Sequence, residues 1–186
     1  MQFIKSILIT VLCLTLCTVT AQEEENTPQK KRPDFVLVFT KTAEYRHSSI
    51  TAGVKVLREL GRQNNFIVIR TESSEDFTER NLKNYSLVVF MSTTGDVLDA
   101  NEQRAFENYI KSGGSYLGVH AAADTEYDWE WYGKLVGGYF NGHPNDPNVR
   151  KAIVQKVVGD HPSTKHLSDS WTRNDEWYNF KQLNSN

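Results

Sequence analysis

The segment Ser115-Tyr-Leu-Gly-Val-His-Ala-Ala-Ala-Asp-Thr125 decides the fold. It follows a pair of glycines and reads as a short strand that ends on His120, after which small residues turn the chain away. Ligands of open α/β sheets bind beyond the carboxyl ends of the strands, so His120 is placed at the expected site. The spacing Gly118-Val-His120-Ala-Ala122 also matches a nucleophile elbow, with His in the nucleophile position. That position therefore holds neither Ser nor Cys for a covalent acyl intermediate.

Apolar runs before this segment predict further strands of the same sheet. Phe35-Val-Leu-Val-Phe39 and Leu87-Val-Val-Phe90 are continuous and rich in β-branched residues, which is typical of parallel strands covered on both faces. Residues 66–70 predict one more strand. Because helical patterns separate these runs, we predict an α/β fold: three layers, α/β/α, around a mostly parallel, doubly wound sheet of flavodoxin-like order.

Apolar residues at helical spacing predict the helices between the strands. One helix begins at Ser48 or Ser49 and ends at Gly61, and another is capped by Asp99 and runs through Ile110. The remaining patterns predict a short surface helix over residues 76–85, a helix over residues 129–136 and a strand near the sheet edge over residues 149–158.

Composition excludes one class of partner. The chain is 39% hydrophobic and 24% charged with a formal net charge of −2, as in an ordinary globular domain. It contains no basic stripe interleaved with aromatic residues, so we expect no nucleic-acid partner.

The N-terminus resembles a secretory signal. Lys5 precedes an apolar run over residues 7–16, and Val19-Thr-Ala21 suits a cleavage site. The run is too short to span a bilayer, so we predict a signal peptide over residues 1–21, no transmembrane segment, and export to the periplasm or the extracellular space. A lipoprotein anchor at Cys17 is disfavoured because Leu16 stands where that signal needs a small residue.

Removal of the signal would leave a chain without thiols. Both cysteines, Cys13 and Cys17, lie within the signal, which excludes a Cys-dependent reaction or a Cys-ligated metal in the mature protein. Residues 22–33 are polar, charged and proline-containing, and they predict a flexible leader. A single domain then follows over residues 34–186.

Four motifs together resemble the trehalose-utilisation (ThuA-like) family of the class I glutamine amidotransferase-like superfamily. They are His47-Ser-Ser-Ile50, Gly118-Val-His-Ala-Ala-Ala-Asp-Thr125, Phe140-Asn-Gly-His-Pro144 and Asp175-Glu-Trp-Tyr178. The resemblance implies a three-layer α/β fold and a role in sugar metabolism, near trehalose or oxidised (3-keto) sugars. Members of the family usually continue through a further strand, so the resemblance also implies a domain that is incomplete at its C-terminal end.

Three histidines are candidate metal ligands. His47 follows the first strand, His120 ends the fourth, and His143 lies in a glycine- and proline-containing loop, so a flavodoxin-like order brings them to one edge of the sheet. Imidazole with carboxylate suits a divalent ion such as zinc, and we expect no nucleotide cofactor. Each histidine alone is better read as a hydrogen-bonded loop or capping residue, and only the convergence of all three makes a shared site as good a reading.

Carboxylates and aromatic residues complete the candidate site. Glu176 is a candidate general base or ligand, and Asp124 a candidate partner that orients the His120 ring, although both could be helix or turn caps. The candidate substrate-binding residues are Tyr45, Arg46, Trp129 and Tyr132, of which the last two could instead belong to the core.

Two functions remain open from the sequence. The first is an exported enzyme that acts on a carbohydrate or modified sugar as a hydrolase, lyase or isomerase, with His120, Glu176 and Asp124 as the catalytic residues and without amidotransferase activity. The second is a non-catalytic sugar-binding or interaction domain on the same scaffold. The enzyme hypothesis predicts a closed polar pocket with a histidine of perturbed pKa, whereas the binding-domain hypothesis predicts a shallow aromatic platform.

Overall fold

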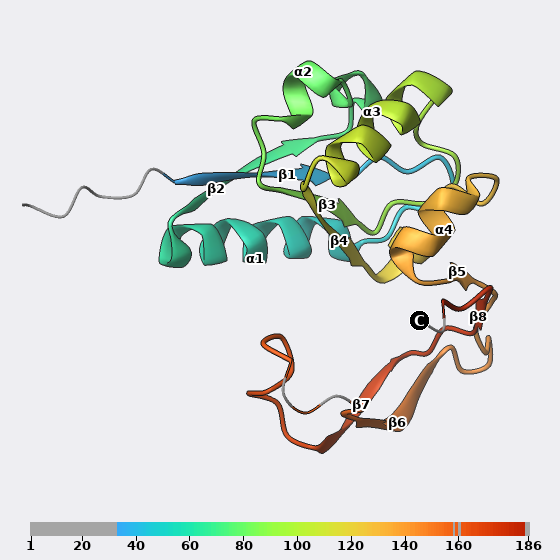
Figure 1. Ribbon diagram of the computed structural model, residues 1–186. Helices are drawn as coiled ribbons and strands as arrows, with labels where there is room; N and C mark the ends of the chain where they lie inside the picture. The colour runs from blue at the N-terminus through green and yellow to red at the C-terminus, as the bar shows by residue number, and fades with distance from the viewer. Residues whose placement is uncertain (1–32, 158, 160, 185–186) are drawn as a thin grey trace, which may run out of the picture. The chain divides into compact units, whose positions relative to one another are not determined.

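The computed structural model of the protein describes residues 33–157, 159 and 161–184. Its main sheet has parallel strands β1 (Asp34–Phe39), β2 (Phe66–Thr71), β3 (Leu87–Met91) and β4 (Ser115–Val119) in the order β2-β1-β3-β4 (Figure 1). This order confirms the predicted flavodoxin-like arrangement. The predicted signal peptide and all of the predicted leader except Pro33 lie outside the described residues.

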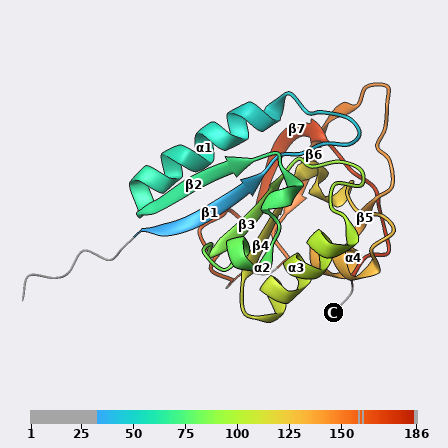
Figure 2. The ribbon, with the colours of Figure 1, turned by 90° about the horizontal axis from the view of Figure 1, so that it is seen from above.

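Helices cover both faces of this sheet, which confirms the predicted three layers. Helix α1 (Ser49–Asn64) lies on one face, and α2 (Glu79–Leu82) and α3 (Ala100–Lys111) lie on the other (Figures 1 and 2). None of the described helices is long and apolar enough to cross a membrane.

Side chains of β1 alternate between two apolar clusters. Val36 and Val38 pack with Val54 of α1, while Leu37 and Phe39 belong to the larger cluster on the opposite face. Burial on both faces explains why the sequence of this strand is continuously apolar. The larger cluster is mainly aromatic and includes Phe39, Phe77, Phe90, Phe106, Tyr109, Tyr132 and Tyr139.

Helix α1 extends beyond its predicted end at Gly61. The helix continues to Asn64, and Asn65 ends it with a left-handed backbone at φ 57°. Gly61 is needed for close packing instead, because a Cβ there would lie 2.5 Å from the carbonyl oxygen of Phe66. The glycine therefore marks the approach of β2 to the helix and not the helix end.

Helix α3 begins with a capping box. The Asp99 carboxylate accepts hydrogen bonds from the backbone N–H groups of Asn101 and Glu102, and the Glu102 carboxylate accepts one from the N–H of Asp99. The predicted cap at Asp99 is confirmed.

Removal of this cap tests its contribution to stability. We expect Asp99→Ala to lower the free energy of unfolding by about 1 kcal/mol, because the first turn of α3 loses its acceptor. Urea denaturation followed by circular dichroism measures the change. Asp99→Ser is the control, since serine keeps an acceptor and should retain most of the stability; an equal loss in both variants would contradict a role for the cap.

The helices predicted over residues 76–85 and 129–136 are shorter in the structure. The first is divided into a 3-10 turn, η1 (Ser74–Asp76), and α2, which begins after Thr78 accepts a hydrogen bond from the N–H of Asn81. The second is α4 (Glu130–Val136), which ends at Gly137 with φ 94°.

The C-terminal strands do not join the main sheet. β6 (Val149–Gln155) pairs antiparallel with β7 (Ser170–Glu176), and β5 (Tyr139–Phe140) pairs with β8 (Phe180–Lys181). The prediction that residues 149–158 form a strand near the edge of the parallel sheet was therefore wrong in its placement. The next strand along the chain, β7, pairs with β6 along its full length, so the two strands form a hairpin of their own.

Candidate functional site

His120 lies where β4 ends and turns into the 3-10 turn η2 (His120–Ala123). Its backbone has φ 51°, which is rare for a residue other than glycine. The alanines of η2 are buried beneath it, and their small side chains let the turn pack closely. A strained residue of this kind is typical of functional positions, because the surrounding structure must hold it there.

His47 lies in the loop between β1 and α1 and packs edge-on against the His120 ring, with ring centroids 4.6 Å apart. Its Nδ1 atom is buried and has no hydrogen-bond partner among the described residues. Burial, and next the charge of His120, hold the pKa of His47 below its ordinary value. The ring is therefore neutral at neutral pH, with a nitrogen lone pair available to a ligand.

Glu176, at the end of β7, joins two of the histidines. Its Oε2 lies 3.4 Å from Nε2 of His120, and its Oε1 lies 3.3 Å from Nε2 of His143. Nδ1 of His143 lies 3.0 Å from the carbonyl oxygen of Pro144, to which it donates. The His143 ring is thus held with its Nε2 toward the carboxylate.

Tyr178 packs against both His120 and His143. Its hydroxyl lies 3.1 Å from Nε2 of His120, and the two ring centroids are 4.7 Å apart. Burial, followed by the negative charges of Glu176 and Asp124, raises the pKa of Tyr178 far above its ordinary value. The hydroxyl therefore keeps its proton and acts as a hydrogen-bond donor.

The donor atoms converge on one point. His47, His120 and Glu176 each offer one ligand atom, and the three atoms lie within 4.8 Å of one another. His143 approaches this group through Glu176 rather than as one of the three. Among the described residues this is the set of His and carboxylate groups whose spacing could hold a metal ion.

Asp124 lies beside the cluster without a hydrogen bond to His120 among the described contacts. It accepts a hydrogen bond from the hydroxyl of Tyr127 instead. Its negative charge nevertheless acts on His47 and on Tyr178. Asp124 therefore contributes to the electrostatics of the site and does not orient the His120 ring directly.

The candidate substrate-binding residues divide into two groups. Tyr45 is 71% exposed and packs edge-on against His47, which leaves a free ring at the cluster. The guanidinium of Arg46 pairs with Glu72 at 2.6 Å and also donates to the carbonyl oxygen of Thr40, so it lies on the β2 side of the loop.

The other two aromatic candidates differ in burial, because Tyr132 is buried and Trp129 is partly exposed. Tyr132 is fully buried in the aromatic core, where its hydroxyl donates to the carbonyl oxygen of Ala122. It has no face for a sugar ring, and we do not retain it as a substrate-binding residue. Trp129 stacks on Trp131 and lines a hollow of about 570 Å³ that also includes Tyr45 and Asp124.

A second hollow opens directly beside the cluster. It has a volume of about 380 Å³, and His120, Glu176 and Tyr178 line it together with the small residues Gly118 and Ala122. Tyr178 was not among the candidate site residues, although it ends the motif Asp175-Glu-Trp-Tyr178. That motif was the available signal, because residues 177–179 lie outside β7 and no strand alternation fixes the direction of this side chain.

One comparison with known proteins points to a family. The family model described as ThuA, trehalose utilisation, matches residues 35–186. No curated protein matches the chain.

Two solved structures resemble this one. A ThuA-like protein from Bacteroides uniformis ATCC 8492 is 24% identical with a TM-score of 0.69, and the match covers 83% of this chain and 64% of that one. A ThuA-like protein from Parabacteroides merdae ATCC 43184 is 18% identical with a TM-score of 0.64, and the match covers 79% and 63%. The chain therefore spans less than two thirds of the length of either protein, and at this identity the likeness shows the fold.

Proposed function

Because the chain belongs to the trehalose utilisation (ThuA) family, we propose that it is an enzyme that acts on a carbohydrate or modified sugar. The reaction would take place at the cluster of His47, His120 and Glu176. The observation that supports this most is the convergence of three ligand atoms within 4.8 Å beside a hollow of about 380 Å³. The lowered pKa of His47 at this cluster favours an enzyme over a binding platform, although the hollow itself is open and its lining is more apolar than polar.

The cluster fits a divalent metal ion such as zinc. Two imidazoles and a carboxylate are ligands that zinc commonly takes in catalytic sites, and the buried Nδ1 of His47 lacks any other partner among the described residues. A bound ion would supply a Lewis acid that polarises an oxygen of the substrate. His47, His120 and Glu176 would hold it, and His143 would contact the carboxylate of Glu176.

The protein's own side chains can do the remaining chemistry. A hydrolase, lyase or isomerase that acts on a sugar needs one group that moves a proton and one that stabilises charge on oxygen. The pair of His143 and Glu176, in contact at 3.3 Å, is placed to accept and pass on a proton. Tyr178 keeps its hydroxyl proton and can donate a hydrogen bond to an oxygen in the hollow.

An amidotransferase reaction does not fit this site. His120 occupies the position after β4 where a nucleophile elbow carries its nucleophile, and both cysteines of the sequence lie at positions 13 and 17. We propose that the scaffold serves sugar chemistry without a thioester intermediate.

A substrate screen tests the proposal. The purified chain is incubated with oxidised (3-keto) and unoxidised disaccharides, with added zinc or with a chelator. We expect turnover of an oxidised disaccharide that rises with zinc, because its carbonyl both coordinates a cation and acidifies the neighbouring C–H bond. His120→Ala should abolish it.

The matched control for this screen is His161→Ala. His161 is exposed, bonds to Ser163, and lies outside the cluster, so its loss should leave turnover unchanged. Saturable sugar binding without turnover, at any metal concentration, would instead identify a non-catalytic sugar-binding domain.

We also propose that the protein is exported, on the strength of residues 1–21, which lie outside the described part of the chain. Determination of the mature N-terminus after expression in a secreting host tests this, and we expect it at Gln22.

A further inference from the structure

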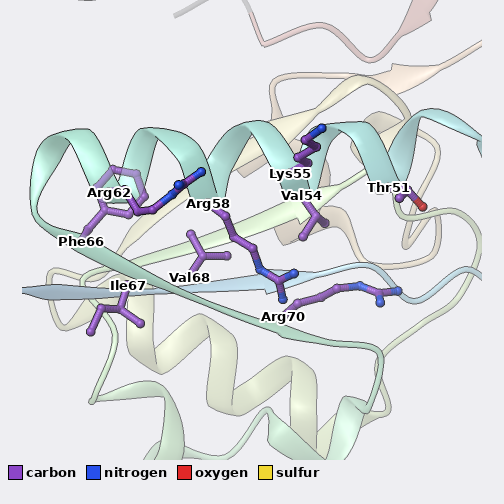
Figure 3. A pocket seen from close by; sticks show the side chains of 9 residues that line it. All are labelled: Thr51, Val54, Lys55, Arg58, Arg62, Phe66, Ile67, Val68 and Arg70. Atoms are coloured by element: carbon purple, nitrogen blue, oxygen red, sulfur yellow. The ribbon is translucent and has the colours of Figure 1, made fainter.

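A basic groove runs between α1 and β2 (Figure 3). Its volume is about 600 Å³. Val54 of α1 and Phe66 and Val68 of β2 form an apolar floor. Cationic side chains from both elements surround it, namely Lys55, Arg58, Arg62 and Arg70.

Two of these cations lack an acidic partner. Arg62 forms an ion pair with Glu59, and Arg70 with Glu72. Among the residues that the structure describes, no carboxylate pairs with Lys55 or Arg58, and both are exposed. The middle of the groove therefore carries a net positive charge in a protein whose formal net charge is −2.

The strand that borders the groove is an edge strand. In the order β2-β1-β3-β4, β2 pairs with β1 on one side, and its other side has no partner strand in the described part of the chain. An edge of this kind presents a row of unpaired backbone N–H and C=O groups. Ile67 and Ile69, on the face of β2 opposite to Val68, are 41% and 39% exposed.

We propose that this edge binds an extended peptide segment of alternating acidic and apolar residues. Such a segment would pair with β2 through its backbone and add a fifth strand to the sheet. Successive side chains of a strand point to opposite faces. The acidic ones would thus meet Lys55 and Arg58, and the apolar ones would extend the surface of Ile67 and Ile69.

The positive charge of the groove favours an acidic peptide over a second copy of the chain. Two copies that pair through β2 would each bring Lys55 and Arg58 to the interface, and like charges placed together there repel. A partner with carboxylates at every second position instead neutralises them. The apolar floor, with Val68 at its centre, suits the aliphatic part of glutamate side chains better than it suits a purely ionic ligand.

Fluorescence anisotropy with a labelled short peptide of alternating valine and glutamate tests the proposal. We expect saturable binding that weakens as the salt concentration rises, because the contacts with Lys55 and Arg58 are solvent-exposed. The double variant Lys55→Glu, Arg58→Glu should weaken binding about tenfold or more, since two attractions become repulsions. The matched control is Arg80→Glu, Lys83→Glu, which makes the same charge change on exposed residues at α2 and should leave binding unchanged.

Backbone pairing is tested separately with N-methylated peptides. The amide N–H groups of an extended peptide point alternately to its two edges, and only one edge faces β2. Methylation of the amides on that edge should abolish binding, whereas methylation of the amides on the other edge should leave it intact.

Three results would overturn the proposal. They are equal binding of both methylated peptides, equal binding of a peptide with its glutamates clustered at one end, and equal loss in the control variant. Tighter binding of single-stranded DNA of the same charge would assign the groove to a nucleic acid instead. A concentration-dependent dimer that displaces the peptide would assign it to a second copy.

Discussion

Glu176→Gln is expected to lower the affinity for zinc by at least about 100-fold and to abolish the metal-dependent turnover. Glu176 supplies the carboxylate of the cluster, and it also contacts both His120 and His143. Loss of a residue that only supports a ligand typically costs 10–100-fold in metal affinity, and loss of a ligand should cost more. Glutamine keeps the size of the side chain, so the fold of β7 should be preserved.

Isothermal titration calorimetry with zinc measures this effect directly, and turnover of the sugar identified in the screen measures it in parallel. Glu75→Gln is the control, because Glu75 is an exposed acid of η1 outside the cluster. Unchanged zinc affinity and unchanged turnover in Glu176→Gln would show that the cluster has a structural role only.

Glu126→Ala is expected to lower the free energy of unfolding by about 3 kcal/mol. Glu126 is 2% exposed, and its Oε1 accepts hydrogen bonds from the backbone N–H groups of Val97 and Leu98, each at 2.8 Å. Its Oε2 accepts one from the Gln103 side chain at 2.6 Å. Alanine would leave two buried N–H groups without an acceptor just before α3 begins, in addition to a cavity. Urea denaturation measures the loss, and a loss below that of Asp99→Ala would contradict the role of Glu126 as a buried anchor.

The pH dependence of stability provides a second test of Glu126. Burial, the largest effect, raises the pKa of this carboxyl above its ordinary value despite three hydrogen bonds to it. The folded state therefore binds the proton at a higher pH than the unfolded state does. Stability from this group is fully present below the unfolded pKa and is lost as the pH rises through the folded pKa. The protein should therefore lose stability relative to Glu126→Gln as the pH rises above about 4. Parallel curves of unfolding free energy against pH for the two proteins would contradict this.

The main sheet could be predicted from the sequence because each of its strands is defined by local composition. The runs at β1 and β3 are apolar without alternation, and only a strand covered on both faces needs such a sequence. The end of α1 could not be predicted in this way. A glycine inside a helical pattern reads as a stop, whereas Gly61 is required by the backbone of Phe66, which becomes its neighbour only after folding.

Parts of the site were equally hidden, for the same reason. His120 was marked by its place after a strand, but the approach of Glu176 depends on the path of the β6–β7 hairpin, which is set by pairing between distant residues. Glu126 gave no signal, because nothing near it in the sequence shows that Val97 and Leu98 will need an acceptor. Residues that act through contacts distant in the sequence can be identified only once the fold is known.

The position of Glu176 on the hairpin couples binding to folding. His47 and His120 belong to loops of the four-stranded sheet, whereas Glu176 ends β7, which among the described strands pairs with β6 alone. An ion or substrate that contacts all three residues would bridge two separately hydrogen-bonded sheets. By mass action, such a ligand stabilises the arrangement that binds it, so part of its binding free energy would be spent on fixing the hairpin. The affinity measured for any ligand of this cluster would then report how ordered β6 and β7 are before it arrives.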